Sequence, residues 1–263
     1  MTEHGHPSPG PGDSAGQPWK GRHFESHGSE NDDGSAPEEL IAAIQRFRDD
    51  RDNDGASQSD VVDALRGVRL LVPLVAHAGD EGVTDAGLRV DKTQELSLVT
   101  VSGPDGRRVL PAFTSVEALA VWNPTARPIP VAARRAALAA AAEDTELIVI
   151  DPGSPTEFAL RRPAVWAIAQ DLPWQAPTAD PAVAAAFERS ISGEPAIAAF
   201  RLVAGDPDAR LSGRELVVLL ALLPGLDQAA LGALVGRLQD AWAQDATIAE
   251  RVDSLGVKLT AVS

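Results

Sequence analysis

The side chains of this chain that could perform chemistry are carboxylates and histidines, because its 263 residues include no cysteine. The absence of cysteine excludes disulfide scaffolds, zinc–thiolate sites and thiol nucleophiles. The sharpest motif is DRDNDGASQSDV, in which Asp50, Asp52, Asp54 and Gly55 match the opening of a calcium-binding loop. In such a loop, oxygens at alternate positions converge on the ion, and the glycine permits a sharp turn.

This calcium pattern is incomplete. Its twelfth position is Val61 rather than a bidentate glutamate, and its eighth is Ser57 rather than an apolar residue. Acid-rich linkers of acidic proteins produce such runs readily. We therefore expect a solvated linker here, with Asp50, Asp52 and Asp54 as the alternative metal candidates.

Two histidines have neighbours that suggest chemistry. If Met1 is removed, His4 becomes the third residue, and the terminal amine, two amides and its imidazole could bind copper(II) or nickel(II) in a square plane. Any exposed terminus with a histidine at that position shares this capacity, so we expect no physiological metal there. His77 stands near Asp80 and Glu81, but a general base also needs a positioned substrate, and a solvated histidine is the simpler interpretation.

No Ser/His/Asp arrangement of recognised spacing and no glycine-rich phosphate loop occurs in the sequence. The sequence therefore predicts no catalytic residue, no cofactor and a protein that is not an enzyme. A carboxylate-dependent enzyme stays open as the third possibility.

The net charge of the chain limits the classes of partner that it can bind. A formal net charge of −15 repels phosphate backbones and anionic lipid surfaces, so we expect neither a nucleic-acid nor a membrane partner. No apolar run is long enough to span a bilayer, and the opening MTEHGHPSPG lacks the features of a signal peptide. We expect a cytoplasmic protein with an unknown protein partner and an undetermined oligomeric state.

The elements that must position these groups follow an acidic leader. Residues 1–36 are crowded with Gly, Pro, Ser and acidic residues, which predicts disorder. Trp19 and Phe24 are large apolar residues within it, and such residues often dock onto a partner or onto the folded body. We take these two as candidate partner anchors.

The rest of the sequence predicts an α+β fold of two small mixed regions with mostly antiparallel sheets. We expect a helical segment over 37–66, one region over 67–175 and another over 176–263, separated by the proline-rich DLPWQAPTADP. Within the first region, Gly103–Gly106 form a hairpin turn, and Thr114 with Glu117 predicts a capping box. Trp122 and Trp166 are expected in the core. The second region reads as helix, two strands, a long helix over 227–243, a helical turn and a final strand.

Several blocks carry a family resemblance. RLLVPLV, KTQELSLVTVSGPDGRRVLPAFTSVEALAVW, ARPIPV, LIVIDP and RRPAVWAIA resemble the successive blocks of the SseB N-terminal domain over about residues 60–175. Residues 180–263 are similar in outline to the C-terminal domain of that family, and GRHFESHGSENDDGSAPEEL resembles the leader of actinobacterial members. The resemblance implies a fold but no reaction, and no catalytic or binding residues carry over.

We therefore expect a non-enzymatic cytoplasmic module that acts through protein interaction or regulation. The alternative is a sensor of a small molecule such as an amino acid, with a cleft near Arg127, His77 and the loop 77–94. A deep cleft with converging polar groups would favour a sensor or an enzyme, whereas an exposed apolar patch would favour a protein partner.

Overall fold

The chain forms helices and short strands in nearly the order that the sequence predicts. The computed structural model describes residues 32–50, 55–74, 99–142 and 145–262. Before the proline-rich segment the elements are α1 (Glu38–Asp49), α2 (Ala56–Arg66), β1 (Arg69–Leu74), β2 (Val101–Ser102), β3 (Arg108–Ala112), α3 (Val116–Trp122), β4 (Arg127–Ala132), α4 (Ala133–Ala142), β5 (Ile148–Ile150), β6 (Phe158–Leu160) and α5 (Arg162–Gln170). After it they are α6 (Pro181–Ile191), β7 (Ile197–Ala204), β8 (Leu216–Leu222), α7 (Gln228–Gln244), α8 (Ala246–Arg251) and β9 (Leu255–Ala261).

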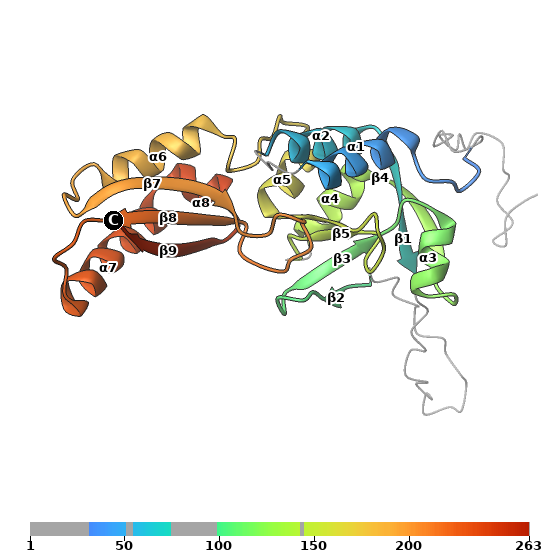
Figure 1. The fold of residues 1–263 in the computed structure, drawn as a ribbon. Helices are drawn as coiled ribbons and strands as arrows, with labels where there is room; N and C mark the ends of the chain where they lie inside the picture. The colour runs from blue at the N-terminus through green and yellow to red at the C-terminus, as the bar shows by residue number, and fades with distance from the viewer. Residues whose placement is uncertain (1–31, 51–54, 75–98, 143–144, 263) are drawn as a thin grey trace, which may run out of the picture. The chain divides into compact units, whose positions relative to one another are not determined.

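The described strands form three separate sheets, with the orders β1-β4, β2-β3-β5-β6 and β7-β8-β9 (Figure 1). Antiparallel pairs (β1–β4, β2–β3, β5–β6 and β7–β8) outnumber the parallel pairs β3–β5 and β8–β9. The fold is therefore α+β with mostly antiparallel sheets, as predicted. Among the described residues, the strands before the proline-rich segment share no sheet with those after it.

The first helix illustrates how local sequence produces the fold. Pro37 precedes α1, and Glu38 and Glu39 lie in its first turn, where acids interact favourably with the positive end of the helix dipole. Leu40, Ala43, Ile44 and Phe47 are buried along one face. The ring of Phe47 meets that of Phe158 edge to face at 5.2 Å. This apolar stripe anchors α1 to the core that α2, β1, α4 and α5 also enter.

The start of α3 corrects one prediction. Its N-cap is Ser115, whose Oγ accepts a hydrogen bond from the Ala118 N–H at 3.0 Å. Thr114 is buried instead, and its hydroxyl donates to Asp151 Oδ2 at 2.7 Å. The predicted Thr114–Glu117 capping box is therefore wrong by one residue. The Thr114 hydroxyl donates its hydrogen bond to the carboxylate of Asp151, which lies in a distant loop, and Ser115 caps the helix instead.

The sheet β7-β8-β9 has one covered face. Alternate residues of β8, from Leu216 to Leu222, are buried against α6, α7 and α8 (Figure 1). Phe187 of α6 and Trp242 of α7 meet there with ring centroids 5.3 Å apart. The residues between them on β8, such as Leu219, are only half-buried. The helices therefore cover one face of this sheet and leave the outer edge of β7 unpaired by any described strand.

Candidate functional site

A network of buried charges joins α5 to the segments around the β7-β8-β9 sheet. The side chain of Arg161 is only 4% exposed. Its Nη2 lies 2.6 Å from Asp206 Oδ2, and its Nη1 lies 3.2 Å from Asp253 Oδ2. Asp206 comes from the β7–β8 loop and Asp253 from the turn between α8 and β9. Arg161 therefore ties two turns of the later elements to the start of α5.

Both aspartates of the network are held in the charged form. Burial alone would raise the pKa of Asp206, but hydrogen bonds from Ser212 and Arg161 outweigh it and hold this pKa below its ordinary value. Burial also opposes ionisation of Asp253, and the contacts with Arg107 and Arg161 again lower the pKa overall. The two carboxylates are thus paired and hydrogen-bonded, as buried charges must be.

Glu215, at the end of the same loop, behaves differently. It is 8% exposed, and its Oε2 accepts the Asp253 N–H at 2.5 Å. Among the described residues, none donates to its buried Oε1. Burial raises the pKa of Glu215 to about 7, because the hydrogen bond from Asp253 offsets only part of the cost of ionisation. Near neutral pH this side chain is divided between its two protonation states.

A raised glutamate pKa beside a lowered aspartate pKa is the arrangement that acid–base catalysts use. Such catalysis needs a cavity through which a substrate reaches the pair. Two surface hollows, one between α6 and β7 and one beside α5, are not lined by any of the network residues Arg161, Asp206, Glu215 and Asp253. The contacts of the network are those that connect α5 to the two turns that carry Asp206 and Asp253.

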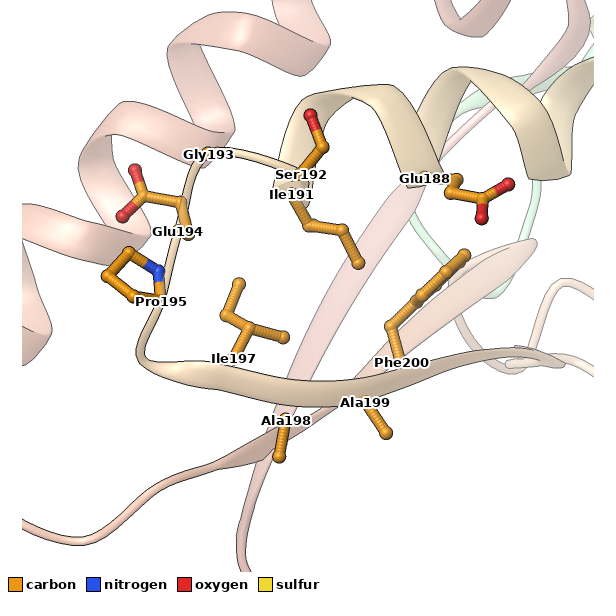
Figure 2. Close-up of a pocket in the computed structure, with 10 residues that line it drawn as sticks. All are labelled: Glu188, Ile191, Ser192, Gly193, Glu194, Pro195, Ile197, Ala198, Ala199 and Phe200. Carbon is orange, nitrogen blue, oxygen red and sulfur yellow. The ribbon is translucent and has the colours of Figure 1, made fainter.

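The first hollow is a groove between α6 and β7, with a volume of about 550 Å³. Figure 2 shows the side chains of Ile191, Ile197 and Phe200 directed into it, while Ala198 and Ala199 point away beyond the strand. We call this hollow the β7 groove. The turn at Gly193–Pro195 closes one end, because it leads the chain from the helix back to the strand.

The backbone beside the β7 groove has unpaired hydrogen-bonding groups. The Gly205 N–H donates to Glu215 O at 3.1 Å, which fixes the ladder between β7 and β8. Since the direction of backbone groups alternates along an antiparallel strand, Phe200, Leu202 and Ala204 direct their N–H and C=O groups away from β8. No described residue bonds to these groups. The groove thus lies beside an open strand edge of the kind that can accept another strand.

The rim of the β7 groove is acidic. Glu188 and Glu194 stand at opposite ends of it (Figure 2). Arg237 binds Glu194 through two hydrogen bonds, of 2.9 and 2.8 Å, and this pairing lowers the pKa of Glu194. Glu188 is exposed and has no ion-pair partner in the described part of the chain. The groove therefore presents one uncompensated negative charge.

A second hollow, of about 520 Å³, lies beside α5 and the start of the proline-rich segment. Trp166 lines it and is 40% exposed, so the expectation that this tryptophan lies in the core is wrong. The buried Nε1–H of Trp174, a second lining residue, finds no acceptor within the described ranges. Arg251 at its border pairs with Asp180 at 2.7 Å.

Most of the site residues that the sequence predicts lie outside the described part of the chain. Of the calcium candidates only Asp50 is described, and it accepts a hydrogen bond from Ser57 Oγ at 2.5 Å. Asp52, Asp54, His4, His77 and the candidate anchors Trp19 and Phe24 lie outside the described residues. Within the described residues, no group of three or more His, Cys, Asp or Glu side chains could hold a metal ion. The metal and anchor predictions stay predictions.

Sequence reasoning missed the β7 groove although it predicted α6 and β7. The available signal was an irregularity in β7, where two small residues, Ala198 and Ala199, separate the large apolar Ile197 and Phe200. Sequence reasoning also missed Arg161, because the adjacent arginines in ALRRPAV read as ordinary surface charges.

Comparison with known proteins gives one family match, which lies before the proline-rich segment. Residues 40–167 match the family model described as the SseB protein N-terminal domain. No curated protein and no solved structure matches the chain. None of the described helices is long and apolar enough to cross a membrane. The chain therefore contains an SseB N-terminal domain over residues 40–167.

Proposed function

We propose that this protein is a non-enzymatic, cytoplasmic interaction or regulatory module that presents the β7 groove to a protein partner. One observation carries the proposal: the unpaired edge of β7 adjoins an apolar groove. Strand edges with free backbone groups are recognition surfaces, and a neighbouring hollow adds side-chain selectivity. On this proposal the segment after residue 176, which resembles the SseB C-terminal domain, carries the binding surface.

The charge of the protein supports a protein partner over a nucleic acid. The net charge is −15, and the uncompensated charge at the groove is also negative. Phosphate-bearing partners would meet repulsion at this surface. A polypeptide can bring both the apolar and the basic side chains that such a groove favours.

Affinity capture with mass spectrometry from native cells tests the proposal. The bait is the full chain, compared with a groove variant that carries Glu188→Lys and Ile191→Lys. The matched control variant carries Glu117→Lys and Val121→Lys on α3, where Glu117 is exposed and Val121 is 83% exposed. Both variants gain the same charge and lose one glutamate and one β-branched aliphatic side chain. Ile191 is half-buried and Val121 is exposed, so the unfolding check below is part of the comparison.

We expect the wild type and the control variant to retain the same partner, and the groove variant to retain several-fold less of it. Thermal unfolding of all three proteins checks that they stay folded. Failure of the wild type to retain any protein above background would contradict the proposal. Equal loss of the partner in both variants would contradict the assignment to this groove.

The second hollow favours a second candidate function, a small-molecule sensor. Of the cleft predicted for such a sensor, Arg127 is the described member, and it is exposed on β4. The buried Nε1–H of Trp174, to which no described residue offers an acceptor, supplies a better-founded site beside Trp166. This candidate predicts that serine or a related amino acid raises the melting temperature, and that Trp166→Ala abolishes the rise. No rise with any of these amino acids would contradict it.

A further inference from the structure

We infer that the partner contributes an extended segment that joins the sheet as a new strand beside β7, placing an apolar side chain in the β7 groove and a lysine or arginine two positions away, toward Glu188. This inference rests on the proposed function and specifies the chemistry of the partner.

The backbone of β7 requires an extended partner. Phe200, Leu202 and Ala204 offer N–H and C=O groups at a spacing of two residues. Only a strand presents complementary groups at that spacing over several residues. A helix satisfies its own backbone groups and would leave those of β7 unpaired.

The shape of the groove requires an apolar anchor. In an added strand, alternate side chains point to the helix-covered side of the sheet, where Ile191, Ile197 and Phe200 line the groove (Figure 2). A volume of about 550 Å³ is ample for one large aliphatic or aromatic side chain. Burial of that side chain supplies the hydrophobic part of the affinity.

The charges on the two sides of the sheet determine which face of the added strand carries the basic residue. Glu188 faces the groove side without a described cation, so a basic side chain there gains a favourable interaction. Arg201 alternates with Phe200 along the strand and is exposed on the opposite side of the sheet. A basic residue next to Arg201 would be repelled. The lysine or arginine therefore belongs on the same face of the segment as the apolar anchor.

Other described edges fit an added strand less well. β4 contains Pro128 and Pro130, which have no N–H to donate. β9 pairs with β8 along its other side, and neither described hollow lies next to it. The combination of open edge, apolar groove and acidic rim occurs at β7.

A selection from a display library of random linear dodecapeptides tests the inference. The target is the full chain, and the selected peptides are synthesised and titrated by calorimetry. We expect enriched peptides with an apolar residue two positions from a lysine or arginine. Their affinity should fall about tenfold or more for the Glu188→Lys, Ile191→Lys variant and stay unchanged for the Glu117→Lys, Val121→Lys variant.

N-methylation of a selected peptide, one amide at a time, provides the signature of strand addition. Because alternate amides face β7, methylation should abolish binding at every second position and be tolerated between them. Methylation effects without this period of two would overturn the inference, as would peptides that bind the groove variant normally. An empty selection, or a dimer of this chain formed through β7, would also overturn it. Partner capture that succeeds in spite of these results would leave the proposed function standing.

Discussion

Replacing Glu215 by glutamine should make the protein more stable than the wild type at alkaline pH but not at acidic pH. The pKa of Glu215 in the folded protein is about 7, against 4.5 for an ordinary glutamate. The folded state therefore holds this proton more tightly than the unfolded state does. The wild type gains from protonation below about pH 4.5 and loses that stability as the pH rises to about 7. Glutamine keeps the shape of the neutral side chain at every pH.

The size of the effect follows from the two pKa values. Each pKa unit corresponds to about 1.4 kcal/mol, and between about pH 5 and pH 8.5 the loss amounts to roughly 2 to 3 kcal/mol. Urea unfolding followed by tryptophan fluorescence measures it, with Glu215→Gln and wild type compared at each pH. The other ionisable groups are common to both proteins, so the difference in unfolding free energy isolates Glu215.

We expect the difference between variant and wild type to grow by roughly 2 to 3 kcal/mol across that range in favour of the variant. A difference that stays constant with pH would refute the reasoning, because Glu215 would then have the same pKa in both states. A difference of the opposite sign would mean that the charged form is stabilised in the fold. Equal dependence on urea concentration in both proteins confirms that the same transition is compared.

Other substitutions test the packing around this network and the corrected helix cap, each by urea unfolding. Arg161→Met leaves the buried Asp206 without its cation, while Asp253 keeps Arg107, and should cost about 3 to 5 kcal/mol. Arg237→Ala at an exposed pair should cost little. Thr114→Val removes the hydroxyl that donates a hydrogen bond to the buried Asp151, and it should lower the unfolding free energy by about 1 to 3 kcal/mol. Ser115→Ala removes the N-cap side chain of α3 and should lower the unfolding free energy by about 1 kcal/mol. An unchanged unfolding free energy would mean that Ser115 does not cap the helix. Gly55→Ala should cost more than about 1 kcal/mol, since its φ is 92° and the new Cβ would lie 2.6 Å from a threonine hydroxyl.

Local sequence patterns predicted most of the elements. The apolar stripe of α1, the proline before it and the acids of its first turn act within one helix, so they were readable without the fold. The same holds for the continuous apolar run of β8 and for the proline-framed β4. Each of these signals concerns residues that are neighbours in the chain.

The missed features depend on residues distant in the chain. Thr114 fits a capping box in the sequence, but in the fold its hydroxyl donates to Asp151, 37 residues later. Arg161 resembles a surface arginine until Asp206 and Asp253 surround it, 45 and 92 residues later. The β7 groove exists because of the way α6 crosses the sheet, and no periodicity within either element determines that crossing.

One missed feature could have been predicted. β8 is followed by two helices and then by β9, and a strand that returns through helices to the same sheet is normally parallel to the first. The observed β8–β9 pair is parallel, from Leu216 opposite Leu255 to Leu222 opposite Ala261. This pairing makes β8 central and leaves β7 at an edge, which is the arrangement on which the proposed function depends.

Hydrogen–deuterium exchange of the full chain with its captured partner tests the central claim most directly. If the partner adds a strand to β7, the outward amides of Phe200, Leu202 and Ala204 should exchange more slowly in the complex, while those of the central strand β8 stay as they were. Protection confined to other segments, with the exchange of residues 197–204 unchanged, would contradict the claim that β7 presents the binding surface.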